Sequence, residues 1–143
     1  MKKYLSGIFF LFSVSSILCG QSDPLVKKCI LSAGPTAKYL RDFSIQLGEN
    51  HSQGEFRYKA ALSLRKKTKY RFTLCTADNS KGQLILNLMD EANKIVLSSV
   101  DQKTGTVYPF VDFICNKSGV YQVGFDFTEG QSGSGVSIVS MIK

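Results

Sequence analysis

The sequence predicts an all-β fold, an antiparallel β-sandwich of about eight strands. Apolar and polar residues alternate with a period of two through most of the chain after residue 42, which is typical of strands with one buried face. Polar or glycine-containing turns separate these segments, and only residues 35–41 hint at a helix. The 143 residues leave room for one domain once a short leader is removed.

The first twenty residues are predicted to be a cleaved signal peptide. Lys2 and Lys3 supply a positive start, a short apolar run follows over residues 8–18, and Gly20 is a small residue at a plausible cut. Serines interrupt the run, which is shorter than the roughly 20 apolar residues of a membrane-spanning helix. The mature protein is therefore expected to be secreted or periplasmic.

Cys19 offers a second processing route. The residues before it resemble a bacterial lipoprotein lipobox, in which a lipid on the cysteine would anchor the protein at a membrane or the outer surface. A lipobox has a small residue directly before the cysteine, where this chain has Leu18. The sequence therefore favours cleavage near Gly20, with lipid attachment to Cys19 as the alternative and peripheral membrane association only in that case.

Residues 21–143 are predicted to form a single β-sandwich domain. Residues 21–41 are expected to be an N-terminal extension packed on it, either lying across the sandwich or forming an edge strand. Pro35 is suited to the first turn of a helix, so residues 35–41 are expected to form one helical turn at most.

Eight segments of the mature chain carry the strand pattern, at 43–47, 56–64, 70–74, 84–88, 95–97, 110–115, 121–127 and 136–142. The fourth and fifth flank a polar turn at 90–94 and are expected to pair as a hairpin. The sixth is apolar throughout except for Asp112, which predicts a central strand covered on both faces and makes Asp112 the acid to examine for a buried hydrogen bond. Glycines at 130–135 predict a flexible connection before the last strand.

The cysteines predict one disulfide and one free thiol. Cys29, Cys75 and Cys115 remain after removal of the leader, an odd number in a compartment that permits disulfides, and the spacing does not fix the pair. It also matches no local zinc pattern, so no metal site is predicted. The single histidine, His51, lies in a polar turn and gives no support to a Cys-His nucleophile. No assembled set of nucleophile, base and oxyanion donors is evident, so the protein is predicted to be no enzyme and to need no cofactor.

The densest charge feature lies between residues 57 and 71. The chain has a formal charge of +7, which falls to +5 when Lys2 and Lys3 leave with the signal peptide. If the strands at 56–64 and 70–74 pair, one basic patch forms from Arg57, Lys59, Arg65, Lys66, Lys67, Lys69 and Arg71. Such a patch would bind sulfate, phosphate or carboxylate groups of an anionic polysaccharide. The alternative is that the lysines protect an edge strand from aggregation.

Aromatic residues supply one further candidate site and much of the expected core. No aromatic side chains interleave with the cations, so nucleic acid is not predicted as a partner. The chain has no tryptophan, and Tyr108 is the tyrosine best placed in a loop to stack on a sugar. Tyr121 is expected in the core, with its hydroxyl bonded to a backbone group at a corner of the sandwich. The core is also expected to hold Phe72, Phe113, Phe125 and Phe127.

Three segments also carry a family resemblance: Lys69–Leu74, then residues 84–97 through the polar turn, then Lys117–Val123. In this order they resemble the bacterial pre-peptidase C-terminal domain and related jelly-roll β-sandwiches, over residues 56–142. The resemblance implies a jelly-roll-like sandwich and a role in adhesion, secretion or substrate association. No peptidase domain precedes these segments in the sequence, so an accessory role does not transfer directly.

Two functional hypotheses follow. The first is an exported non-enzymatic binding or structural accessory module at or outside the cell envelope, with an envelope or extracellular protein or an anionic polysaccharide as its partner. The second is a carbohydrate- or polyanion-binding protein that uses the basic hairpin at 57–71 or the Tyr108 loop.

Overall fold

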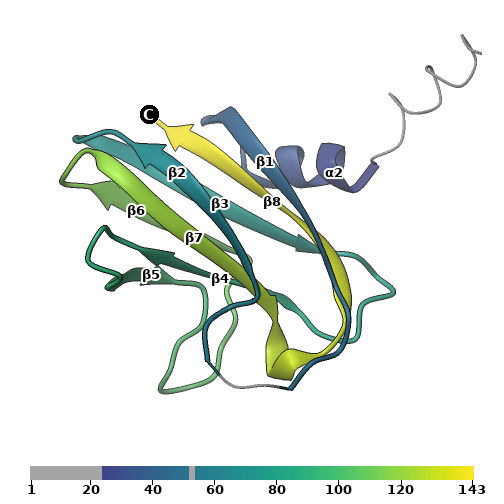
Figure 1. Ribbon diagram of the computed structural model, residues 1–143. Coiled ribbons are helices and arrows are strands. Elements are labelled where there is room, and N and C mark those ends of the chain that lie inside the picture. Colours follow the sequence, from purple (N-terminus) through teal and green to yellow (C-terminus); the bar gives the residue numbers. More distant parts are fainter. Residues whose placement is uncertain (1–23, 52–53) are drawn as a thin grey trace, which may run out of the picture.

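The computed structural model describes residues 24–51 and 54–143, which form two facing β-sheets and one short α-helix (Figure 1). The predicted signal peptide, with Lys2, Lys3 and Cys19, lies outside the described residues. All paired strands are antiparallel, so the all-β prediction is confirmed.

The strand order is that of a jelly roll. One sheet has the order β1-β8-β3-β6 and contains β1 (Ala37–Leu47), β8 (Gly133–Ile142), β3 (Thr68–Thr76) and β6 (Phe110–Cys115). The other has the order β2-β7-β4-β5 and contains β2 (Tyr58–Leu64), β7 (Gly119–Phe127), β4 (Leu84–Met89) and β5 (Ile95–Ser98). Consecutive strands cross between the sheets except at β4 and β5, which form the predicted hairpin.

The core consists of the inward-facing side chains of both sheets, as the alternation predicts. Phe72, Phe125 and Phe127 are fully buried, and Tyr121 is buried near one end. Phe113 is partly buried and packs edge-on against Tyr121, with ring centroids 5.7 Å apart. The predicted core aromatics therefore face the interior.

The glycine-rich connection before the last strand is shorter than expected, because β8 begins at Gly133. A 3₁₀ turn, η1 (Thr128–Gly130), precedes it and ends at Gly130, where φ is +69°. A Cβ on Gly130 would lie 2.2 Å from the carbonyl oxygen of Asn50, so this close crossing of two loops requires glycine.

The predicted central position of residues 110–115 is wrong. β6 is an edge strand that pairs only with β3. Its inward side is partly covered by the core, but Phe110 is 44% exposed and Ile114 is 63% exposed on the outward side. A nearly continuous apolar sequence therefore forms an edge strand. Burial of only one face of this strand does not require apolar residues on the other face.

The predicted helical turn at residues 35–41 is also wrong, because residues 37–41 are the first part of β1. The helix lies upstream as α2 (Pro24–Ser32), and Gly34, with φ +96°, follows its end. Pro35 therefore lies beyond the helix and leads into β1. The helix packs on the outer face of the first sheet, where Leu25, Val26 and Cys29 contact β8 residues.

A disulfide joins α2 to the sheet. Cys29 and Cys75 are bonded, with 5.8 Å between their Cα atoms, and Cys115 is a buried free thiol. One bridge and one free thiol were predicted, and both are present. Disulfides are typical of compartments outside the reducing cytosol. Over the part of the chain that the structure describes, no helix is long and apolar enough to span a membrane.

Replacing both Cys29 and Cys75 with alanine should lower the free energy of unfolding by about 3–4 kcal/mol, because the bridge closes a loop across 46 residues of chain. Urea unfolding followed by circular dichroism measures the change. Wild-type protein in reductant serves as the matched control and should show a similar loss. Equal urea midpoints for reduced and oxidised wild-type protein would contradict a stabilising role of the bridge.

Candidate functional site

The predicted basic patch requires β2 and β3 to pair, and they do not. β2 is an edge strand and pairs with β7, whereas β3 lies between β8 and β6 in the other sheet. The connection at residues 65–67 crosses from one sheet to the other. The seven predicted cations are therefore divided between two sheets and the turn that joins them.

Arg57 has a structural role. Its guanidinium donates to Asp126 from Nη2 at 2.8 Å and from Nε at 3.0 Å, and both side chains are largely buried. It also donates to the carbonyl oxygens of Gly48 and Gln131. Arg57 thus fastens the segment before β2 to β7, to the end of β1 and to the turn before β8, and its donors are used within the fold.

Arg71 is engaged in a second network. Its Nε and Nη2 donate to the two carboxylate oxygens of Asp112 at 2.7 and 3.0 Å, and Nη1 donates to the Ala33 carbonyl oxygen at 3.0 Å. The guanidinium carbon lies 4.4 Å from the centre of the Phe110 ring. These contacts connect β3, β6 and the residue after α2, so Arg71 is not free to bind a ligand.

The expected hydrogen bond of Asp112 is present, but the acid is partly rather than fully buried. Hydrogen bonds from Arg71 are the main reason that the pKa of Asp112 is lowered, and Lys69 Nζ, 3.8 Å away, adds to the effect. Lys59 is also paired, with Glu55. Four of the seven predicted cations therefore form ion pairs: Arg57, Lys59, Lys69 and Arg71.

The other three cations are exposed on the β2–β3 turn, and the β6–β7 turn adds a fourth that the sequence analysis missed. We call this group the basic end: Arg65, Lys66, Lys67 and Lys117. Within the described ranges, none of the four side chains forms an ion pair. Both turns lie at the end of the sandwich that carries the C-terminus (Figure 1).

Hydrogen bonds hold the two turns of the basic end together. The Lys66 N–H donates to Ser118 Oγ at 2.7 Å, and the Lys67 N–H donates to the Cys115 carbonyl oxygen at 2.8 Å. The Arg65 N–H donates to the Tyr70 hydroxyl at 2.8 Å. The backbone that carries the cations is therefore fixed before any ligand binds.

Tyr121 holds the β6–β7 turn from its buried side. Its hydroxyl donates to the Lys117 carbonyl oxygen at 2.7 Å, as the sequence analysis expected for a corner tyrosine. Burial is the main reason that the pKa of Tyr121 is raised to about 12, with further contributions from the Cys115 thiol and the carboxylates of Asp90 and Glu91. The hydroxyl therefore stays protonated and keeps this bond at physiological pH.

Lys67 has a left-handed backbone conformation, with φ +66°. A side chain in this region costs about 1 kcal/mol or more compared with glycine, because Cβ approaches the carbonyl oxygen. Strain of this kind often occurs at functional sites. Lys67 shares this conformation with Asn93 and Glu129 among the described non-glycine residues, and it is the one of the three that lies in the basic end.

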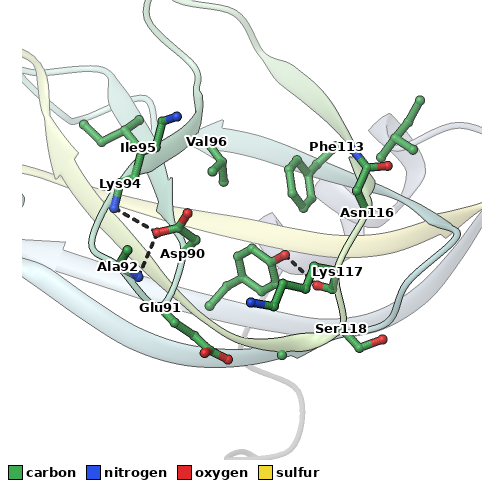
Figure 2. A pocket seen from close by; sticks show the side chains of 13 residues that line it. Asp90, Glu91, Ala92, Lys94, Ile95, Val96, Phe113, Asn116, Lys117 and Ser118 are labelled. Carbon is green, nitrogen blue, oxygen red and sulfur yellow. Dashed lines mark hydrogen bonds between the residues drawn. The ribbon is translucent and has the colours of Figure 1, made fainter.

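A groove of about 770 Å³ adjoins the basic end, between the β4–β5 turn and β6 (Figure 2). Its apolar lining includes Val96 and Phe113, which lie across from one another, and its charged lining residues are Asp90, Glu91, Lys94 and Lys117. Asp90 Oδ1 accepts hydrogen bonds from the N–H groups of Ala92 at 2.9 Å and Lys94 at 3.0 Å. These bonds shape the β4–β5 turn that forms one wall.

Tyr108 lies apart from the basic end. It is 43% exposed in the connection from β5 to β6, and its N–H donates to the Ser99 carbonyl oxygen at 2.9 Å. This connection enters β6 at Phe110, whereas the basic end lies beyond Cys115 at the other end of the same strand. The structure therefore does not bring the two predicted ligand-binding features together.

His51 lies at the end of the sandwich opposite the basic end, beside a cavity of about 460 Å³. Nδ1 is 2.9 Å from the Glu129 carbonyl oxygen and Nε2 is 3.0 Å from Glu49 Oε2. Both partners are acceptors, so a protonated ring satisfies both, and the Glu49 hydrogen bond is the main cause of the raised His51 pKa. Cys115 lies near the start of β7 and Glu129 just after its end, so histidine and thiol are not assembled into one site.

Comparison of the chain with protein-family models found no match, and comparison with curated proteins found none either. The resemblance to pre-peptidase C-terminal domains therefore stays a prediction. Over residues 24–51 and 54–143, no group of three or more acidic, histidine or cysteine side chains is placed to hold a metal ion.

Asp112→Asn should lower the free energy of unfolding by about 1–2 kcal/mol at pH 7, because Arg71 loses its charged acceptor. The lowered pKa of Asp112 means that its contribution is present above the ordinary aspartate range and is lost as pH falls through the folded-state pKa. The difference between wild type and variant should thus shrink below about pH 4.

Urea titrations from pH 7 to pH 2.5 measure this difference, with the exposed Asp78→Asn as the matched control. A wild-type advantage that is unchanged at pH 2.5 would show that the ion pair does not cause it.

Proposed function

We propose that this protein is an exported, non-enzymatic β-sandwich that binds an anionic polymer of the cell envelope or extracellular surface through its basic end. The observation that carries the proposal is the group of four exposed cations, free of ion pairs within the described residues, on two hydrogen-bonded turns: Arg65, Lys66, Lys67 and Lys117. Cations in this arrangement form charge-assisted hydrogen bonds with sulfate, phosphate or carboxylate groups.

The rigidity of the two turns favours binding. The Lys66 and Lys67 N–H groups are already bonded to Ser118 and Cys115, so only the side chains lose freedom when a ligand binds. The left-handed conformation of Lys67 gives further support, because glycine would fit the backbone with less strain.

Neighbouring acids restrict where an anionic polymer can lie. Figure 2 shows Asp90 and Glu91 on the turn across the groove from Lys117. Their carboxylates repel an anion on that side. The polymer is therefore expected to run over the β2–β3 turn, with Lys117 at the border of the contact.

Export is supported by two independent features. The disulfide between Cys29 and Cys75 is typical of an oxidising compartment, and residues 1–20 have the composition of a signal peptide. An anionic surface polymer is available to a protein in that location, which agrees with the ligand class proposed.

Lys66→Glu combined with Lys67→Glu should weaken binding to heparin or lipopolysaccharide about tenfold or more. Each surface ion pair contributes about 0.2–1 kcal/mol, and charge reversal replaces attraction with repulsion. Titrations of residues 21–143 at 50 and 300 mM salt measure the affinity, which should fall with salt for the wild type.

Lys81→Glu combined with Lys103→Glu is the matched control, because it makes the same change in net charge at the opposite end of the sandwich. Equal losses of affinity in both double variants would show that only net charge matters. Salt-insensitive binding would instead favour stacking on an aromatic side chain such as Tyr108.

Lys67→Gly should stabilise the protein by up to about 1 kcal/mol and yet weaken heparin binding, because it removes both the backbone strain and one of the four cations. Thermal unfolding and the same titration give the two readouts. Lys66→Gly removes an equal charge without relieving a left-handed residue, so it should weaken binding without stabilising. Unchanged affinity in Lys67→Gly would remove Lys67 from the site.

A further inference from the structure

The groove between the β4–β5 turn and β6 is lined by charges of both signs. Asp90, Glu91 and Lys94 come from the β4–β5 turn, and Lys117 comes from the opposite side (Figure 2). None of these four side chains forms an ion pair with another described residue. An anion in the groove meets the carboxylates as well as the lysines, and a cation meets the lysines as well as the carboxylates. A ligand with charge of only one sign therefore does not complement this lining.

Glu91 brings its carboxylate close to the turn that carries Lys117. A Cβ on Gly119 would lie 2.6 Å from Glu91 Oε1, so the acid lies against the start of β7 in space that the glycine leaves open. Burial is the main cause of the raised Tyr121 pKa, and the nearby carboxylates of Asp90 and Glu91 add to it. Figure 2 shows the Lys117 side chain extending toward the β4–β5 turn. Charges of both signs thus flank one end of the groove.

Hydrogen bonds fix both turns before a ligand binds. Asp90 Oδ1 accepts from the N–H groups of Ala92 and Lys94, and the Asp90 N–H donates to the Lys94 carbonyl oxygen at 3.0 Å. On the other side, the Tyr121 hydroxyl donates to the Lys117 carbonyl oxygen at 2.7 Å. The backbone around the charged groups therefore loses little freedom when the groove is filled.

The remaining lining of the groove is largely apolar. Val96 and Phe113 lie across from one another, and the Phe113 ring packs edge-on against Tyr121. Ile95 and Ile114 also line the groove and are 54% and 63% exposed. The volume of about 770 Å³ lies within the roughly 300–1,000 Å³ of small-molecule sites. An apolar group placed here would remove exposed apolar surface from water.

We propose that this groove binds a small zwitterion with an apolar body, of the chemical class of a short apolar peptide or an apolar amino acid. The ammonium group lies beside Asp90 and Glu91, and the carboxylate lies beside Lys117, with Lys94 as the second cation of the lining. The apolar side chains lie between the two apolar walls. Each charge of the ligand then forms charge-assisted hydrogen bonds with a group of opposite sign.

The probe is the dipeptide leucyl-phenylalanine, titrated into residues 21–143 at pH 7 and 50 mM salt and followed by amide chemical shifts. It should saturate with a Kd below about 10 mM. The largest shifts are expected at residues 90–96 and 113–119. N-acetylation removes the ammonium group and C-terminal amidation removes the carboxylate, and each should weaken binding about fivefold or more.

Two further ligands separate the contributions to binding. Glycylglycine keeps both charges but has no apolar side chain, so it should bind about tenfold more weakly than leucyl-phenylalanine, or more weakly still. Free phenylalanine distinguishes the two sources of the ligand. Tighter binding of the dipeptide than of phenylalanine assigns the groove to peptides, and the reverse order assigns it to amino acids.

Two exposed residues supply the matched test in the protein. Glu91→Gln should weaken binding of leucyl-phenylalanine about threefold or more without weakening binding of the N-acetylated form, which has no ammonium group. Lys117→Met should weaken the free dipeptide by a similar factor without weakening the amidated form, which has no carboxylate. A merely structural role of either side chain would weaken all three ligands alike. Near-ultraviolet circular dichroism verifies that both variants are folded.

Three results would overturn the proposal: no saturable shifts with leucyl-phenylalanine up to 10 mM, equal affinities of the free and the two capped dipeptides, or the largest shifts outside the groove. Neither Lys66 nor Lys67 lines the groove. Dipeptide binding can therefore fail while heparin still binds at the basic end, and heparin binding can fail while the dipeptide still binds.

Discussion

The short connection between β2 and β3 is the constraint on which the candidate site depends. Leu64 and Tyr70 are buried in opposite sheets, and packed sheets lie roughly 10 Å apart. The four Cα steps from Leu64 to Thr68 span at most about 14 Å, so the chain crosses the gap with little slack. The turn is therefore sharp, with Lys67 in the left-handed region and three cations exposed at one corner.

The basic side chains of residues 57–71 fall into two groups, those bonded to other parts of the fold and those exposed on the short β2–β3 connection. Arg57 and Arg71 each have a carboxylate partner, and each also donates to backbone carbonyl oxygens where segments from distant parts of the chain meet. The cations on the turn have no such neighbours among the described residues. A cluster of basic residues in a sequence therefore overstates a binding surface when some of them connect elements of the fold.

Local patterns predicted the strands well because alternation reports burial of one face, and the positions of Phe72, Phe125 and Tyr121 follow from it. Which strands pair is not encoded locally, so the pairing assumed for the basic patch was wrong. Lys117 was missed as a site residue for the same reason, although the turn before Tyr121 was a usable signal. The apolar run of β6 was interpreted as a central strand, because the sequence does not show how many neighbouring strands pair with a given strand.

Mapping of amide chemical shifts during titration with a sulfated heparin hexasaccharide tests the central claim most directly. Binding at the basic end predicts that the largest shifts fall on residues 65–67 and 116–118, with smaller changes at the far end of the sandwich. Shifts concentrated around Tyr108 or His51, or spread evenly over all exposed lysines, would contradict it.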